Sequence, residues 1–131
     1  MIMDIAGKKM KPLVIDRATW ARGGRGGASG LKNGLGNRCC LGFACLQVHR
    51  KSIKAIMFKA VPSSVGIKVY YKARTVSNIR ISGWSLESQM VTINDRYMTE
   101  RRRERLLKKC FASVGIAARF VGKGFPKEPN P

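Results

Sequence analysis

The sequence TERRRERLLKKCFASVG (residues 99–115) runs directly into IAARFVG (116–122), and together they predict a helix followed by a strand. Thr99 is a favoured helix N-cap, and Glu100 places a negative charge in the first turn, where the helix dipole is positive. Gly115 is the residue expected to end the helix. The residues whose helical spacing predicts an inward-facing stripe are Arg103, Leu106, Leu107, Cys110, Phe111 and Val114.

The preceding part of the chain contains further segments with a regular pattern. KPLVIDRATW (11–20) alternates between two faces and predicts a short strand that ends near Trp20. Asn37 is expected to cap a helix over residues 38–50, within NRCCLGFACLQVHR. Residues 31–33 are expected to be briefly extended, 66–82 to form a strand or hairpin, and 84–93 to form a short amphipathic helix.

These segments predict one small α+β domain over residues 11–122. A short antiparallel or mixed sheet, which includes the first and last strands, is expected to pack against two main helices, one after Asn37 and one after Thr99. Residues 1–10 are expected to form a flexible N-terminal segment. Residues 123–131 carry three prolines and are expected to form an extended tail.

Charge is the abnormal feature of the composition. The 131 residues include 26 Lys and Arg but 7 Asp and Glu, which gives a formal net charge of +19. A hydrophobic content of 44% is typical of a folded protein and excludes a chain that is disordered throughout. Self-repulsion of this size destabilises the folded state, and a polyanion is the commonest partner that offsets it. An anionic membrane and an acidic protein surface are the other candidates.

The cellular setting is expected to be the cytoplasm. No segment has the roughly 18 consecutive apolar residues of a membrane-spanning helix, so no membrane partner is expected. The start MIMDIAGKKMKP (1–12) does not have the order of charges and apolar residues found in a signal peptide. Cysteines in a cytoplasmic protein are expected to be reduced thiols.

The predicted helix after Thr99 carries the main candidate binding residues. Arg101, Arg105 and Lys108 project away from the apolar stripe, and Arg102 and Lys109 flank them. A solvated helix face usually mixes charges of both signs, and pairs of like charges four residues apart are mildly destabilising. A stripe of one sign therefore favours an anionic partner, although it does not separate DNA, RNA and acidic protein.

The tract RGGRGGASG (22–30) contains two further candidates, Arg22 and Arg25. On a flexible loop these arginines could contact a phosphate backbone, since glycines allow close approach. The alternative interpretation is a mobile connector. Two Arg-Gly-Gly units are too few for an autonomous RNA-binding tract.

Cysteine and histidine residues raise the question of a metal site or a catalytic site. Cys40, Cys45 and His49 have the spacing Cys-x4-Cys-x3-His, which Cys39 or Cys110 could complete to four ligands. On a helix, however, Cys40 points about 140° away from Cys45, so buried free thiols are the favoured interpretation and no cofactor is expected. The acidic residues show no paired spacing for acid–base catalysis, and the glycine tract lacks the Gly-Lys-Ser/Thr ending of a phosphate-binding loop.

Several motifs taken together resemble a family of small uncharacterised proteins carried by phages and prophages. They are VIDRATWARG (14–23), CCLGFAC (39–45), VPSSV (61–65) and INDRYMTERRRERLLKKCFASVGIAARFVG (93–122). The resemblance implies a phage context, and so the cytoplasm of a host cell, but no chemistry, because the family has no assigned activity. Relatives tend to have an acidic C-terminal helix, whereas here six basic residues accompany Glu100 and Glu104.

The function expected from these observations is non-enzymatic binding of nucleic acid through phosphate contacts, with little readout of base sequence. An alternative is a phage inhibitor that binds a host or defence nucleoprotein complex. A weaker alternative is a structural protein of the virion or one associated with the ribosome. The sequence leaves open DNA or RNA, the oligomeric state and the biological pathway.

Overall fold

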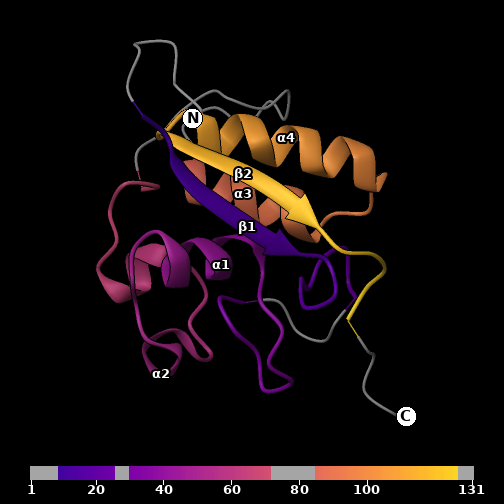
Figure 1. The fold of residues 1–131 in the computed structure, drawn as a ribbon. Coiled ribbons are helices and arrows are strands. Elements are labelled where there is room, and N and C mark those ends of the chain that lie inside the picture. The colour runs from indigo at the N-terminus through magenta and orange to yellow at the C-terminus, as the bar shows by residue number, and fades with distance from the viewer. Residues whose placement is uncertain (1–8, 26–29, 72–84, 127–131) are drawn as a thin grey trace.

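Figure 1 shows the order of helices and strands in the computed structural model, which describes residues 9–25, 30–71 and 85–126. The elements are β1 (Lys11–Asp16), α1 (Cys40–Gln47), α2 (Ile53–Ile56), the 3-10 helix η1 (Pro62–Val65), α3 (Leu86–Asp95), α4 (Glu100–Ala112) and β2 (Ile116–Val121). They form a small α+β domain, as the sequence predicted. Within the described ranges, no helix has the length and apolar character needed to cross a bilayer.

The sheet consists of β1 and β2, which run parallel with Lys11 opposite Ile116 and Asp16 opposite Val121. The prediction of an antiparallel or mixed sheet was therefore wrong. Alternating side chains identify a strand but do not encode its direction, which depends on the path of the chain between strands. Here the intervening chain forms the helices of a crossover, and this is the connection that a parallel pair requires.

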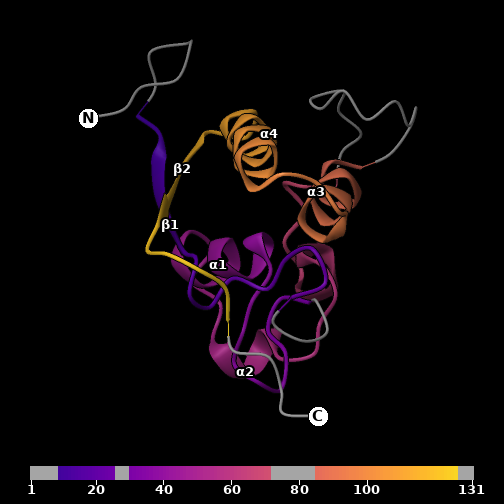
Figure 2. The same ribbon diagram turned by 90° about the vertical axis from the view of Figure 1, so that its right-hand side faces the viewer.

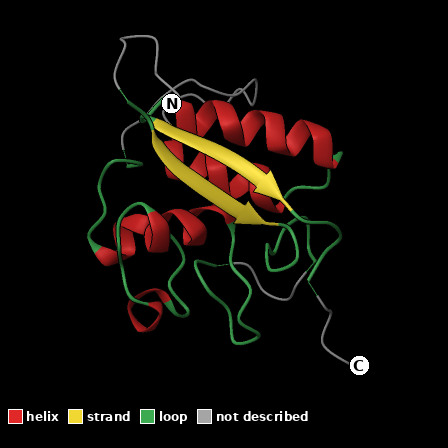
Figure 3. Ribbon diagram, in the orientation of Figure 1, coloured by secondary structure: helices red, strands yellow, loops and turns green. Residues whose placement is uncertain are grey.

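The helices cover one face of the sheet (Figures 2 and 3). Leu13 and Ile15 of β1, together with Ile116 and Phe120 of β2, are buried against them. The side chains of the other face, such as Val14, are more exposed. Figure 2 places α3 and α4 together at one end of the molecule and α2 at the other end, with α1 between them.

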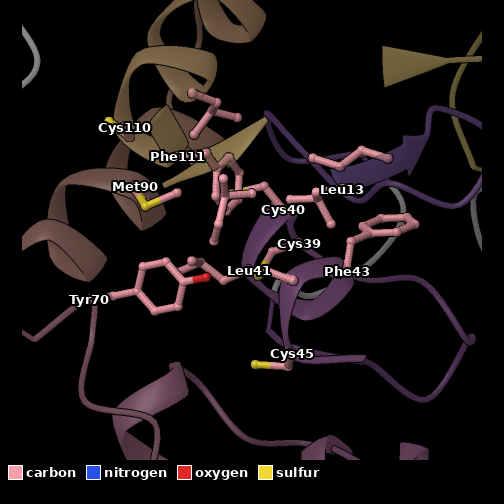
Figure 4. Close-up of a cluster of buried hydrophobic side chains, with 14 of the residues drawn as sticks. Leu13, Cys39, Cys40, Leu41, Phe43, Cys45, Tyr70, Met90, Cys110 and Phe111 are labelled. Carbon is pink, nitrogen blue, oxygen red and sulfur yellow. The ribbon is translucent and has the colours of Figure 1, made fainter. Parts of the chain in front are cut away.

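Helix α1 lies at the centre of the hydrophobic core, where Leu41 packs among side chains from the sheet, α3 and α4 (Figure 4). Six consecutive residues, from Cys40 to Cys45, are buried, so this helix is enclosed on all sides. Gly42 lies against the backbone of the preceding loop. A Cβ atom at this position would lie 1.9 Å from the carbonyl oxygen of Leu31.

The N-terminus of α1 differs from the prediction, because Cys39 occupies the cap position and Asn37 does not. The Asn33 side chain accepts hydrogen bonds from the backbone N–H groups of Leu35 and Asn37, at 2.9 and 3.1 Å, and holds this segment in a turn. The side-chain oxygen of Asn94, in α3, then accepts a hydrogen bond from the Cys40 N–H at 3.0 Å. The helix is thus capped from another element, which sequence spacing does not reveal.

Other elements also begin or end at residues different from those predicted. β1 ends at Asp16, and Trp20 forms only an isolated bridge to Arg38. Lys32 forms an isolated bridge to Met57, consistent with a brief extended segment at 31–33. Residues 66–71 contain no strand, and the remainder of the strand or hairpin predicted at 66–82 lies outside the described residues. The predicted types of element at 84–93, 99–115 and 116–122 are confirmed by α3, α4 and β2. Gly115, with φ 77°, follows the C-cap of α4 by two residues.

The edge of β1 that faces away from β2 is occupied by one side chain. The Gln47 amide accepts a hydrogen bond from the Val14 N–H at 2.8 Å and donates one to the Val14 carbonyl at 2.6 Å. These two hydrogen bonds satisfy the Val14 N–H and carbonyl in the way that a neighbouring strand would. The end of α1 is therefore joined to the middle of β1.

Replacing Gly42 by Ala is expected to destabilise the protein by about 3 kcal/mol, because the new methyl group meets the Leu31 backbone. Helix propensity alone predicts the opposite sign, since Ala favours a helix over Gly. The measurement is urea unfolding followed by circular dichroism. Gly34→Ala is the control, because its Cβ would lie an ordinary 3.6 Å from the Phe58 ring. Equal changes in stability for the two variants would contradict the close approach at Gly42.

Candidate nucleic-acid interface

The exposed face of α4 carries five basic side chains. The opposite face, with Leu106, Leu107, Cys110 and Phe111, is buried in the core, so the direction of the helix is fixed. We call the five residues the α4 basic face: Arg101, Arg102, Arg105, Lys108 and Lys109. All five are exposed, and the Lys108 ammonium lies 6.0 Å from the centre of the Phe120 ring. The structure thus brings together the residues that the sequence analysis selected on this helix.

The two acidic residues of α4 point away from the basic face. Glu104 accepts hydrogen bonds from the Arg17 guanidinium at 2.7 and 2.9 Å. Glu100 accepts one from Arg22 at 3.0 Å and a longer one from Arg103 at 3.4 Å. Among the described residues, no ion pair involves a member of the α4 basic face. The positive charge on this face is therefore not compensated by its own helix.

Arg103 fixes the start of α4 against the end of α3. Its side chain is buried, and one guanidinium nitrogen donates hydrogen bonds to the carbonyls of Ile93, Asn94 and Arg96 at 2.7–2.8 Å. These are carbonyls at the C-terminal end of α3 and just beyond it, which a helix leaves without partners of its own. Helical spacing predicted Arg103 on the inward stripe, but its role as a cap for α3 depends on tertiary structure.

Arg22 differs most from its expected position. It is 1% exposed, and its guanidinium donates hydrogen bonds to the carbonyls of Trp20 and Gly124, both at 2.8 Å, as well as to Glu100. Burial lowers its pKa, and the hydrogen bond with Glu100 opposes that shift. Arg22 is therefore part of the interior and is not available to a phosphate in this structure. Arg22 is buried because Glu100 and the carbonyls of Trp20 and Gly124 supply hydrogen-bond acceptors for its guanidinium, which an exposed loop would not supply.

The glycines beside Arg22 form an ordered turn. Arg22 and Arg25 exchange two backbone hydrogen bonds, of 3.0 and 2.9 Å, across Gly23 and Gly24. Both glycines have positive φ, 57° and 82°, which is the backbone conformation of a two-residue hairpin turn. Residues 26–29 lie outside the described residues. Arg25 itself is exposed, with its guanidinium carbon 4.8 Å from the centre of the Phe125 ring.

The residues considered for a metal site are dispersed. Among the described residues, no three His, Cys, Asp or Glu side chains gather in a way that could hold a metal ion. Cys39, Cys40, Cys45 and Cys110 are all free and buried (Figure 4). His49 Nε2 lies 2.7 Å from the Tyr70 hydroxyl oxygen, and burial lowers the pKa of this histidine.

Burial also sets the chemistry of the thiols. It raises the pKa of Cys39 to about 11 and the pKa values of Cys45 and Cys110 to about 12. The pKa of Cys40 is raised as well. Because the thiolate is the form that attacks electrophiles and binds metals, these four side chains are poor nucleophiles and poor ligands in the folded protein.

Sequence reasoning missed the structural roles of Arg17 and Arg22 and the buried side chain of Asn94, which bonds to Trp20 and Cys40. The sequence contains one weak signal for the burial of Arg22. Trp20 and Arg22 are two residues apart, so their side chains lie on the same side of an extended segment. The pairing of Arg17 with Glu104 and of Arg22 with Glu100 joins residues far apart in the chain, and one sequence contains no signal for it.

Comparisons of this chain with protein-family models, with curated proteins and with solved structures found no match. The resemblance to small phage and prophage proteins therefore stays a hypothesis.

Arg22→Gln is expected to destabilise the protein by roughly 3 kcal/mol, because it removes one partner of a largely buried ion pair and several hydrogen bonds. Arg25→Gln is the matched control in the same turn and is expected to change stability by no more than about 0.5 kcal/mol. Urea unfolding of both variants distinguishes the two arginines. Similar losses would show that the difference in burial has no energetic consequence.

The four thiols are expected to react slowly with a disulfide reagent in the native protein near pH 8 and rapidly once urea unfolds the chain. The reason is that their pKa values lie well above that pH. Absorbance of the released thiol measures the rate. Fast reaction of all four in the native state would contradict their burial, and stoichiometric zinc that is lost together with the fold on chelation would establish a metal site.

Proposed function

We propose that this protein binds nucleic acid, without catalysing a reaction, by placing the α4 basic face against the phosphate backbone. The observation that carries the proposal is the segregation of charge on α4. Its five exposed basic side chains lie on one face, while Glu100 and Glu104 are engaged by arginines outside that face. A helix face that only needed solvation would not require this separation.

The energetics of the helix favour an anionic partner. Arg101 and Arg105, like Arg105 and Lys109, are four residues apart, a spacing at which like charges are mildly destabilising. The helix is held instead by the Thr99 cap and by its buried apolar face. A polyanion would replace the repulsion with attraction and would release its own counterions on binding.

The dimensions of the face also fit a phosphate backbone. From Arg101 to Lys109 the helix rises by about 12 Å, over which duplex DNA presents about seven phosphate charges. Five basic side chains therefore have enough phosphates within reach on a single partner. The fit does not depend on base sequence, so we expect weak sequence preference.

The described titratable groups support a binding protein over an enzyme. Asp16 accepts a hydrogen bond from the Ala18 N–H, and Glu87 accepts two from Ser63. His49 is bonded to Tyr70, and the thiols are buried. Each of these groups has a structural use, and none of them is a carboxylate or histidine directed at the α4 basic face.

A second candidate is the phage inhibitor that docks on a host or defence nucleoprotein complex. The observation that favours it is an apolar surface on the part of the molecule away from α4. Phe58 is 75% exposed and Leu35 is 52% exposed, and both line a cavity of about 340 Å³. Exposed apolar groups of this kind are typical of surfaces that contact other proteins.

The test compares two triple variants of equal charge change in a fluorescence-anisotropy titration with labelled duplex DNA. The helix variant is Arg101→Gln, Arg105→Gln and Lys108→Gln, which keeps good helix formers in α4. The control variant changes Arg50, Lys54 and Lys59 to Gln, all exposed near α2 at the other end of the molecule (Figure 1).

The helix variant is expected to bind more weakly, and the slope of log K against log salt should fall by about one for each lost phosphate contact. The control variant should lose much less affinity. If both lose affinity equally, binding depends on net charge and the α4 basic face is not the interface. If only a protein partner, resistant to nuclease, is recovered with the protein from infected cells, the inhibitor is favoured.

A further inference from the structure

The segment between α3 and α4 presents a fully solvent-exposed aromatic ring. Tyr97 is 100% exposed and precedes the first residue of the α4 basic face, Arg101, by four positions. Phe125, which follows β2, is 37% exposed. Single exposed aromatic residues are common, so exposure alone decides nothing. What matters is that these two rings line the same cavity.

That cavity has a volume of about 570 Å³ and lies at the end of α4 where the basic face begins. Its lining combines the two rings with two exposed cations and a charged floor. The exposed cations are Arg25 and Arg102, neither of which has an ion pair in the described part of the chain. On the floor, Glu100 is already engaged by Arg22 and Arg103. The free charges in the cavity are therefore positive.

A series of rings and guanidinium groups leads from the core to the cavity. The Phe120 and Trp20 rings are 4.8 Å apart, and the Arg22 guanidinium carbon lies 4.2 Å from Trp20 and 4.0 Å from Phe125. Arg25 lies next, 4.8 Å from Phe125, and is exposed. Each member of this series is a planar group that stacks well on an aromatic ring. The series begins in the core and ends with a planar cation at the surface.

We propose that this cavity binds an unpaired base of a single-stranded nucleic acid, stacked against the free ring of Tyr97 and next to Phe125, while Arg25 and Arg102 contact the adjacent phosphates. The proposal rests on the proposed function and deepens it, because it selects single strands over duplex. Bases in a duplex have their faces covered by neighbouring base pairs, whereas single strands offer them to aromatic and guanidinium groups. The volume is sufficient for a base with its sugar.

The test uses labelled single-stranded oligonucleotides of about 12 nucleotides, in DNA and RNA forms, and a DNA duplex of the same length. Tyr97→Ala is expected to weaken single-strand binding by about tenfold, the usual effect of losing one stacked base, and to leave duplex binding unchanged. Tyr97→Phe keeps the ring and should keep the affinity. Tyr71→Ala is the matched control, since Tyr71 is 61% exposed and has a lysine ammonium 5.8 Å from its ring.

A labelled polyglutamate peptide, an anion without bases, completes the set of probes. If Tyr97→Ala weakens polyglutamate binding as much as single-strand binding, base stacking is not the cause and the inference is overturned. If wild-type protein binds both strands and duplex but Tyr97→Ala has no effect, this inference fails while the proposed function stands. If wild-type protein binds none of the nucleic acids, both fail. The DNA and RNA arms show which sugar the site accepts.

Discussion

The buried side chain of Asn94 is the contact on which the rest of the structure depends. Its oxygen accepts hydrogen bonds from the Trp20 indole N–H at 2.7 Å and from the Cys40 N–H, and its nitrogen donates one to the Ala21 carbonyl at 2.9 Å. One amide therefore joins α3 to the segment after β1 and to the start of the central helix. Each of these groups would cost about 1–3 kcal/mol if it were buried without a partner. The Asn94 carbonyl also accepts from Arg103, which sets the position of α4.

Acidic residues are scarce in this chain, and three of them contact groups on other elements of the fold. Glu100 and Glu104 hold arginines that join α4 to the segment after β1, and Glu87 is buried with Ser63. Three of the 7 acidic residues are thereby removed from the balance of surface charge. The consequence is that a face such as that of α4 can be uniformly positive even though its helix contains carboxylates.

Local pattern was sufficient to predict some parts of the fold but not others. Thr99, the apolar spacing of α4 and the run after Gly115 identify a helix and a strand because all of the signals lie within one element. The parallel direction of the sheet and the cap of α1 depend on residues distant in sequence, so no local pattern contains them. The same distinction between local pattern and tertiary contacts applies to the candidate site. Helical geometry predicted which side of α4 is exposed, whereas Arg22 and Arg25 have the same sequence context and differ only in what the folded chain places beside them.

Among the residues that the structure describes, β1 pairs only with β2, so the sheet joins the first and last described elements of the fold. During synthesis, β1 cannot pair with β2 until about 100 further residues have been added, which takes roughly 5–20 s at ordinary translation rates. Gln47 is made much earlier and can engage one edge of β1 through Val14 long before β2 exists. The edge of β1 that pairs with β2 stays unpaired until the ribosome has synthesised the helices and then β2. A chain interrupted before residue 116 would therefore expose an unpaired strand, which makes truncated products the form most prone to aggregate.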